Sequence, residues 1–141
     1  MISGELKKII DRLKEQGKMS FLEGATEEQI SKFEKENDVQ LPEKYKEWLQ
    51  YSDGGDLYLP AGVQLYGVAH KPIIDFEDSD RPDDNYIVVG ALASGDPILF
   101  KKKEEKFYVY DHESQELDDD LTYDDFFALL NDFYDLLGIG E

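Results

Sequence analysis

Hydrophobic side chains in the first third of the chain recur every three to four residues, the spacing that gathers them on one face of an α-helix. This pattern predicts helices over residues 4–15 and 26–37, and a third helix that opens at Pro42. The second helix begins with a capping box, in which the side chains of Thr26 and Gln29 pair with free backbone N–H groups of the first turn. Three helices are therefore expected before residue 55.

After residue 55 the pattern changes to short runs of apolar and aromatic residues, which are typical of β-strands. The connections at residues 93–97 and 102–106 are too short to contain a crossover helix, so neighbouring runs are expected to pair antiparallel. The predicted strands cover residues 57–59, 63–68, 86–89, 98–101 and 107–110.

A last helix is predicted at the end of the chain, with Thr122 as its cap, Asp125 three residues later and Gly138 as its stop. Its apolar stripe consists of Phe126, Leu129, Leu130, Phe133, Leu136 and Leu137. No internal repeat or linker interrupts the sequence. We therefore predict one α+β domain over residues 1–141, in which a largely antiparallel sheet of about five or six strands packs with N-terminal and C-terminal helices.

The chain is strongly acidic, with 33 acidic and 15 basic residues and a net charge of −18. The excess is uneven, because residues 71–141 hold 20 acidic and 6 basic residues while residues 1–70 hold 13 and 9. Such a surface repels phosphate groups, so we expect no binding of nucleic acid or membrane. The same charge attracts a basic protein partner, and it also keeps a protein soluble.

The expected location is the cytoplasm. No apolar run approaches the roughly 20 residues of a membrane-spanning helix. The first 18 residues alternate acidic and basic side chains, which is not the layout of a signal peptide. The sequence contains no cysteine, so a disulfide-stabilised extracellular scaffold is excluded.

The sequence gives little support to catalysis. The only histidines are His70 and His112, and neither belongs to a metal-binding spacing such as His-x-x-x-His. Both are expected to be ordinary residues at the surface or at strand edges. No catalytic residue, metal or cofactor is predicted.

Two acidic segments are the candidate partner-binding residues. The first is a loop with Arg81 as its single base; it lacks the Gly-centred ligand pattern of a Ca²⁺ loop and fits a solvated loop as well as a partner-binding one. The second lies in an acidic run over residues 111–125, where helix capping explains only the last two acids. The candidates are Asp75, Glu77, Asp78, Asp80, Asp83, Asp84, Asp118, Asp119 and Asp120. They form one recognition surface if the fold brings both segments to the same side.

A series of motifs in residues 24–55 carries a family resemblance. A capped, acid-rich helix is followed by a Leu-Pro-x-x-Tyr helix start and a Gly-Gly turn. With the later segments 86–90, 94–96 and 107–113 and the Phe-Phe pair of the last helix, this order resembles the SMI1/KNR4 (SUKH) superfamily over nearly the whole chain. The shared residues are Leu41, Pro42, Tyr45, Trp48, Leu49, Gly54 and Gly55. Asp53 stands where the family usually has Asn.

These shared residues are expected to be mainly structural. Aromatic residues at helical spacing usually belong to a core, and paired glycines usually form a turn. Trp48 has an alternative role as part of a binding face, because tryptophan is enriched among binding hot spots.

The resemblance implies a non-enzymatic binding module. Bacterial members resemble immunity proteins that neutralise toxins, often nucleases, and fungal members resemble regulators of cell-wall synthesis and signalling. We therefore expect an immunity protein that binds a cognate basic toxin domain through an acidic surface, with Tyr58, Tyr66 or Tyr86 as aromatic anchors. The alternatives are a regulatory adaptor of cell-envelope or signalling machinery and, from another class, a hydrolase with a carboxylate site or a bound divalent cation.

Overall fold

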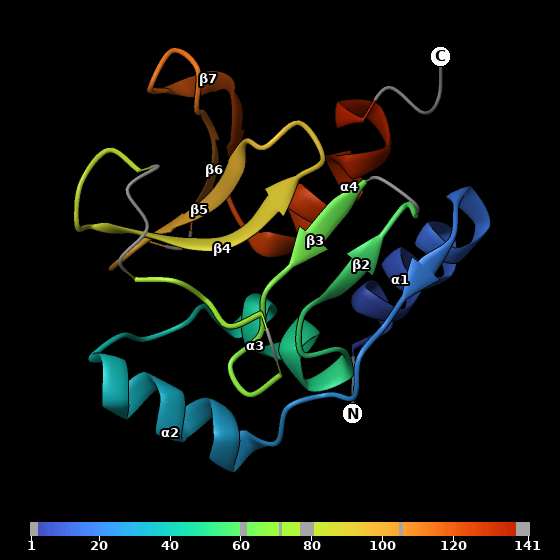
Figure 1. The fold of residues 1–141 in the computed structure, drawn as a ribbon. Coiled ribbons are helices and arrows are strands. Elements are labelled where there is room, and N and C mark those ends of the chain that lie inside the picture. Colours follow the sequence, from blue (N-terminus) through green and yellow to red (C-terminus); the bar gives the residue numbers. More distant parts are fainter. Residues whose placement is uncertain (1–2, 60–61, 71, 77–80, 105, 138–141) are drawn as a thin grey trace.

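The computed structural model describes residues 3–59, 62–70, 72–76, 81–104 and 106–137. Within these residues, four helices and seven strands follow one another along the chain (Figure 1). The helices are α1 (Gly4–Gln16), α2 (Glu27–Asn37), α3 (Glu43–Tyr51) and α4 (Phe126–Leu136). The strands are β1 (Met19–Ser20), β2 (Gly55–Leu57), β3 (Val63–Leu65), β4 (Tyr86–Leu92), β5 (Pro97–Lys101), β6 (Phe107–Asp111) and β7 (Glu116–Tyr123).

The strands form one antiparallel sheet in which each strand pairs with its neighbour in the sequence, in the order β1 to β7. The helices α1, α3 and α4 pack together on one face of this sheet (Figure 1). The core between them contains Leu6 of α1, Trp48 of α3 and Phe126 of α4, all fully buried. This is the α+β fold that the sequence predicts. None of the described helices has the length and hydrophobicity needed to cross a membrane.

The three N-terminal helices agree with the prediction. The capping box of α2 forms, because Thr26 Oγ1 accepts the Gln29 N–H at 3.1 Å and Gln29 Oε1 accepts the Thr26 N–H at 2.9 Å. α2 ends at Asp38, whose φ of 50° lies in the left-handed region. Pro42 is the N-cap of α3 instead of its first residue.

The sheet has seven strands among the described residues, so the prediction of about five or six was too low. The sequence pattern missed β1, which is only two residues long, and β7, which contains Asp118 to Asp120. Among the described residues β7 pairs with β6 alone, so it is an edge strand of the sheet, a position that tolerates charged side chains. In addition, β2 lies at 55–57 instead of 57–59 and β3 ends at Leu65 instead of residue 68.

The start of the last helix was also predicted wrongly. Thr122 and Tyr123 belong to β7 and pair with Tyr108 and Phe107 of β6. The cap is Asp125, whose side chain accepts the Ala128 N–H at 2.8 Å. The aromatic ring of Tyr123 is buried in the core, which favours strand pairing at this position over a helix start. The predicted stop at Gly138 lies outside the described residues.

The cap of α4 provides a test with a pH dependence. Replacing Asp125 with alanine should lower the free energy of unfolding at neutral pH by about 1 kcal/mol, because an orphan N–H group of α4 loses its acceptor. Burial tends to raise the pKa of Asp125, but the hydrogen bond from Ala128 and the nearby Lys44 ammonium hold it below its ordinary value. The lowered pKa means that the stabilisation is complete above the unfolded-state pKa and is lost as pH falls through the folded-state pKa.

Urea unfolding of the wild type and of Asp125→Ala, at neutral pH and below pH of about 3.9, measures this difference. The difference in the free energy of unfolding between the wild type and Asp125→Ala should become smaller in acid. Asp125→Asn is the matched control, since its side-chain oxygen can still cap the helix without a charge. An alanine variant as stable as the wild type at neutral pH would contradict the role of Asp125.

Candidate partner-binding surface

Two hydrophobic clusters lie on opposite faces of the sheet, because side chains alternate along each strand. In β4, Ile87 and Val89 point into the core under the helices, whereas Tyr86 and Val88 belong to the second cluster. Among the described residues, no helix contributes to this second cluster. We call it the tyrosine face, and its members are Tyr66, Tyr86, Val88, Leu99, Tyr108, Tyr110 and Leu117.

The tyrosine face contains both buried and accessible side chains. Tyr86 and Tyr110 are buried by their neighbours, whereas Tyr66, Tyr108 and Leu117 are half-buried. The rings of Tyr86 and Tyr108 meet edge to face with their centroids 5.5 Å apart. Tyrosines held this way offer a preformed apolar surface with hydroxyl groups at its rim, which suits contact with another protein.

A lysine and a glutamate lie beside these rings. Lys101 Nζ lies 5.6 Å from the centroid of the Tyr86 ring and 3.5 Å from Glu104 Oε1. The Tyr108 hydroxyl donates to Glu104 Oε2 at 3.3 Å. Tyr86 and Glu104 raise the pKa of Lys101, and burial together with Glu104 raises the pKa of Tyr108. At neutral pH the lysine is therefore charged and the Tyr108 hydroxyl is a neutral hydrogen-bond donor.

The first predicted acidic segment lies next to the start of β4. Asp75 pairs with Val88 of the tyrosine face through two backbone hydrogen bonds of 2.9 Å. Asp83 and Asp84 are exposed, and Arg81 both donates to the Tyr86 carbonyl at 3.0 Å and pairs with Asp84 at 3.2 Å. The other three candidates, Glu77, Asp78 and Asp80, lie outside the described residues.

The second predicted segment forms a bulge in the edge strand β7. Leu117 pairs with Tyr110 and Thr122 pairs with Tyr108, so residues 118–121 face Val109 alone. Within this bulge the Asp118 carboxylate accepts the Asp120 N–H at 3.0 Å, which is a local role that the sequence did not reveal. The side chain of Asp119 is not among those described. A charged bulge also protects an exposed edge against pairing with another chain.

The described residues of the two acidic segments lie at different strands of the sheet. The first segment adjoins β4 and the second lies in β7, and β5 and β6 separate these two strands by three strand spacings, or about 14 Å. The tyrosine face occupies the sheet surface between them. Aromatic side chains therefore lie between the described acidic residues of the two segments, and the role of these acids in binding a partner stays a prediction.

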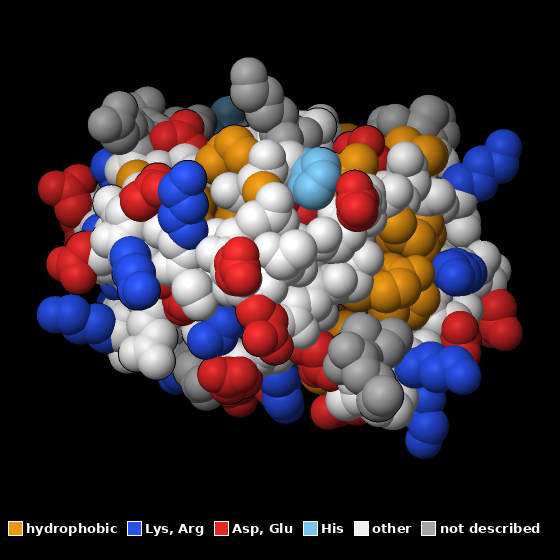
Figure 2. All heavy atoms as spheres, turned by 90° about the horizontal axis from the view of Figure 1, so that it is seen from below, with side chains coloured by type: hydrophobic (Ala, Val, Ile, Leu, Met, Phe, Trp, Pro, Cys, Tyr) orange, Lys and Arg blue, Asp and Glu red, His pale blue; other side chains and the backbone are white. Residues whose placement is uncertain are grey.

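Another face of the molecule carries charges of both signs. The face seen from below in Figure 1 shows lysine or arginine and acidic side chains side by side, around patches of hydrophobic surface (Figure 2). This mixture agrees with the nearly balanced composition of residues 1–70. The negative excess is therefore concentrated toward the second half of the chain.

The family of this fold follows from comparison with known proteins. The model of the SMI1 / KNR4 family (SUKH-1) matches residues 24–137, most of the chain. The chain belongs to the SMI1/KNR4 family. Members of this family are generally non-enzymatic. None of the curated proteins compared with the chain matches it significantly.

The SMI1/KNR4 match begins after α1 and β1. Helix α1 is nevertheless part of the same core, because Leu6, Ile9, Ile10 and Leu13 are buried and α1 contacts α4. The described core therefore extends beyond the matched residues, and α1 lies on the side of the sheet opposite to the tyrosine face.

The residues shared with the SMI1/KNR4 family are structural. Leu41, Tyr45, Trp48 and Leu49 are at most 2% exposed, so the alternative that Trp48 presents a binding face is wrong. Pro42 is also buried and precedes α3. Gly54 and Gly55 have φ angles of 96° and 125°, which a side chain would strain, and they turn the chain from α3 into β2.

Of the three predicted aromatic anchors, two belong to the tyrosine face. Tyr66 and Tyr86 are members of it, but Tyr58 lies on the helix side and is 5% exposed. The Tyr58 hydroxyl donates to Gln16 Oε1 at 3.0 Å, and burial raises its pKa to about 12. Tyr58 is therefore a core residue and not an anchor.

Both histidines are half-buried and have carboxylate partners, a pairing that the sequence did not reveal. Asp53 is fully buried and accepts the N–H groups of Val68, Ala69 and His70 at 2.7–2.8 Å. Its Oδ2 also lies 2.8 Å from His70 Nδ1. His112 pairs in the same way with Asp96. Sequence reasoning could not find these pairs, because their members are 17 and 16 residues apart.

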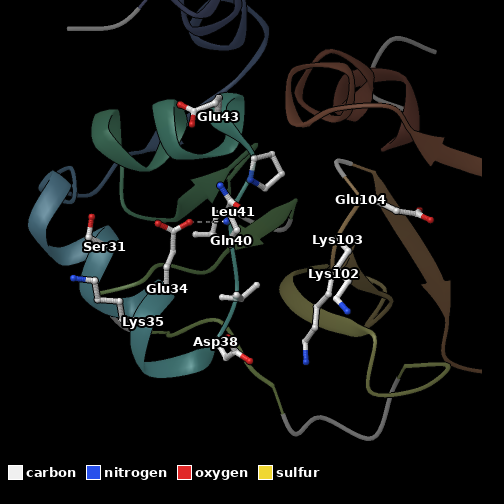
Figure 3. A pocket seen from close by; sticks show the side chains of 12 residues that line it. Ser31, Glu34, Lys35, Asp38, Gln40, Leu41, Glu43, Lys102, Lys103 and Glu104 are labelled. Atoms are coloured by element: carbon white, nitrogen blue, oxygen red, sulfur yellow. Dashed lines mark hydrogen bonds between the residues drawn. The ribbon is translucent and has the colours of Figure 1, made fainter.

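An open hollow of about 910 Å³ lies between α2, residues 38–43 and the turn after β5. Figure 3 shows Glu34 and Lys35 of α2 across from Lys102 and Lys103. The Glu34 carboxylate is already engaged, since it accepts the Leu41 N–H at 2.7 Å and lies 3.8 Å from Lys46. The described lining thus mixes charges of both signs, and this hollow does not single out a ligand.

Proposed function

We propose that this SMI1/KNR4-family protein is a cytoplasmic immunity protein that binds a cognate toxin domain with a basic surface and neutralises it. The observation that supports this proposal is the tyrosine face, a hydrophobic cluster to which no described helix contributes and which has acidic segments on two sides. The half-buried Tyr66 and Tyr108 offer contact area for a partner, and the surrounding carboxylates speed the approach of a basic partner. The family membership and the net charge of −18 agree with this assignment.

The tyrosine face gives the first test of this function. The partner is captured with the tagged protein from lysate of the source cells at moderate salt and identified by mass spectrometry. We expect one basic toxin domain. In a titration with that domain, the double variant Tyr66→Ala with Tyr108→Ala should bind at least about thirtyfold more weakly, as expected for the loss of hot-spot side chains.

Tyr134→Ala is the matched control, because Tyr134 is a half-buried tyrosine on the helix side. It should leave the affinity unchanged. Equal affinity of the double variant and the wild type would show that the tyrosine face does not bind the partner. Capture of several weak partners instead of one would favour the regulatory adaptor.

The acids of β7 should act on the association rate. Replacing Asp118 and Asp120 with lysine should slow association and flatten its dependence on salt, because rim charges act mainly through long-range attraction. The control is Asp11→Lys with Glu15→Lys, which makes the same change of charge on exposed positions of α1. Identical association rates for both double variants would show that only the net charge matters.

A further inference from the structure

One end of the sheet brings two carboxylates and an imidazole together. Asp96 lies in the turn before β5, Asp111 ends β6 and His112 follows it. Because Ile98 pairs with Val109 in antiparallel register, the segments that carry these residues lie side by side. One ligand atom from each of the three lies within 4.8 Å of the other two, and all three side chains are partly buried.

The backbone holds these three side chains in place. The Asp96 carboxylate accepts the His112 N–H at 3.2 Å, and His112 Nδ1 lies 2.5 Å from Asp96 Oδ1. Asp111 Oδ1 accepts the N–H groups of Glu113 and Ser114 at 2.9 and 3.2 Å. These backbone hydrogen bonds lower the pKa of Asp111, so its carboxylate is ionised. The Asp111 Oδ2 atom is not used in these two bonds.

We propose that Asp96, Asp111 and His112 form a binding site for a divalent transition-metal ion such as Zn²⁺. Imidazole nitrogen and carboxylate oxygen are both Zn²⁺ ligands, and three protein ligands leave a fourth position for water. Two ligand atoms about 2.0 Å from a tetrahedral ion lie about 3.3 Å apart. The contact between His112 Nδ1 and Asp96 Oδ1 therefore needs to widen by less than about 1 Å to admit the ion.

The second histidine lacks such a site. Asp53 is fully buried and both of its oxygens already accept hydrogen bonds, three of them from backbone N–H groups. Among the described residues, no second acidic side chain joins Asp53 and His70 in a group of potential ligands. His70 therefore offers a matched control: a histidine of equal exposure that also pairs with a carboxylate.

The test is a titration of the chain over residues 1–141 with Zn²⁺, in which calorimetry measures binding. The buffer does not chelate metals and contains millimolar Mg²⁺ to occupy non-specific carboxylate sites. We expect one saturable site per chain and a melting temperature that rises with Zn²⁺ concentration. His112→Gln should abolish this binding, and His70→Gln should retain it.

A second variant keeps the test independent of folding defects. Asp111→Asn keeps the side-chain oxygen that holds the turn but loses the charge, and it should weaken Zn²⁺ binding by at least about tenfold. Absence of a saturable site in the wild type, or equal affinity in wild type, His112→Gln and Asp111→Asn, would overturn the proposal. This outcome is independent of whether the tyrosine face binds a toxin.

Discussion

Replacing Asp53 with alanine is expected to lower the free energy of unfolding by about 3 to 4 kcal/mol, although Asp53 belongs to no hydrophobic cluster. Its carboxylate accepts three backbone N–H groups from residues 68–70 and contacts the His70 ring. Alanine would leave these donors in a partly buried site without an acceptor. The loop after β3 would also lose its link to the end of α3.

Asparagine at position 53 separates the role of the charge from the role of shape. The neutral side chain has one acceptor oxygen and places an NH₂ group against a backbone donor, so it should cost about 2 kcal/mol. His70→Gln should cost less, because the three backbone bonds remain. Urea unfolding, monitored by circular dichroism, measures the free energy of unfolding of each variant and so tests this order of stability losses. A fully stable Asp53→Asn variant would show that the extra oxygen is dispensable.

The neighbouring glycine agrees with this tight arrangement. A Cβ atom on Gly67 would lie 2.6 Å from Asp53 Oδ1 and 2.5 Å from the Asp53 carbonyl oxygen. Gly67 therefore allows the loop to close over the carboxylate. Its role follows from close approach and not from an unusual φ angle.

The helices could be predicted from the sequence because their signals are local. The apolar spacing of α1 and the capping box of α2 involve residues at most a few positions apart, and both are confirmed. β7 was missed for the opposite reason. Its Glu-Leu-Asp-Asp-Asp run contradicts strand propensity, and it forms a strand because β6 provides the pairing partner and its outer edge is exposed.

The sequence pattern does not predict the tyrosine face. In the run Phe107, Tyr108, Val109, Tyr110, every residue is apolar or aromatic, so period-two alternation cannot separate core from surface. The structure assigns Phe107 and Val109 to the core and Tyr108 and Tyr110 to the tyrosine face. Only the presence of helices on one side of the sheet makes this distinction.

Part of the acidic excess has local structural roles. Asp125 caps α4, Asp111 holds the turn after β6, and Asp118 accepts a hydrogen bond inside the bulge. Asp83 likewise accepts the Asn85 N–H at 2.8 Å. Each of these bonds uses the Oδ1 atom of the carboxylate and does not neutralise its negative charge. The same acids can therefore order the chain and attract a basic partner.

Replacing Trp48 with alanine should lower the free energy of unfolding by about 3 to 5 kcal/mol, because a large, fully buried side chain is removed. Its ring centroid lies 6.0 Å from those of Phe21 and Phe126 and 5.9 Å from that of Tyr51. The variant would thus open a cavity where α3 meets α4. Trp48 is the only tryptophan, so unfolding is followed by circular dichroism and not by intrinsic tryptophan fluorescence.

Tyr45→Phe is the contrasting variant in the same core. The Tyr45 hydroxyl is buried without a hydrogen-bond partner among the described residues, and burial followed by the Asp53 charge raises its pKa far above the ordinary value. Removing this hydroxyl leaves the ring contacts with Phe107 and Phe126 intact, so stability should stay equal or rise by about 1 kcal/mol. A loss of stability in Tyr45→Phe would mean that the hydroxyl has a hydrogen-bond partner. A wild-type stability in Trp48→Ala would mean that this shared aromatic residue is not needed to join α3 to α4.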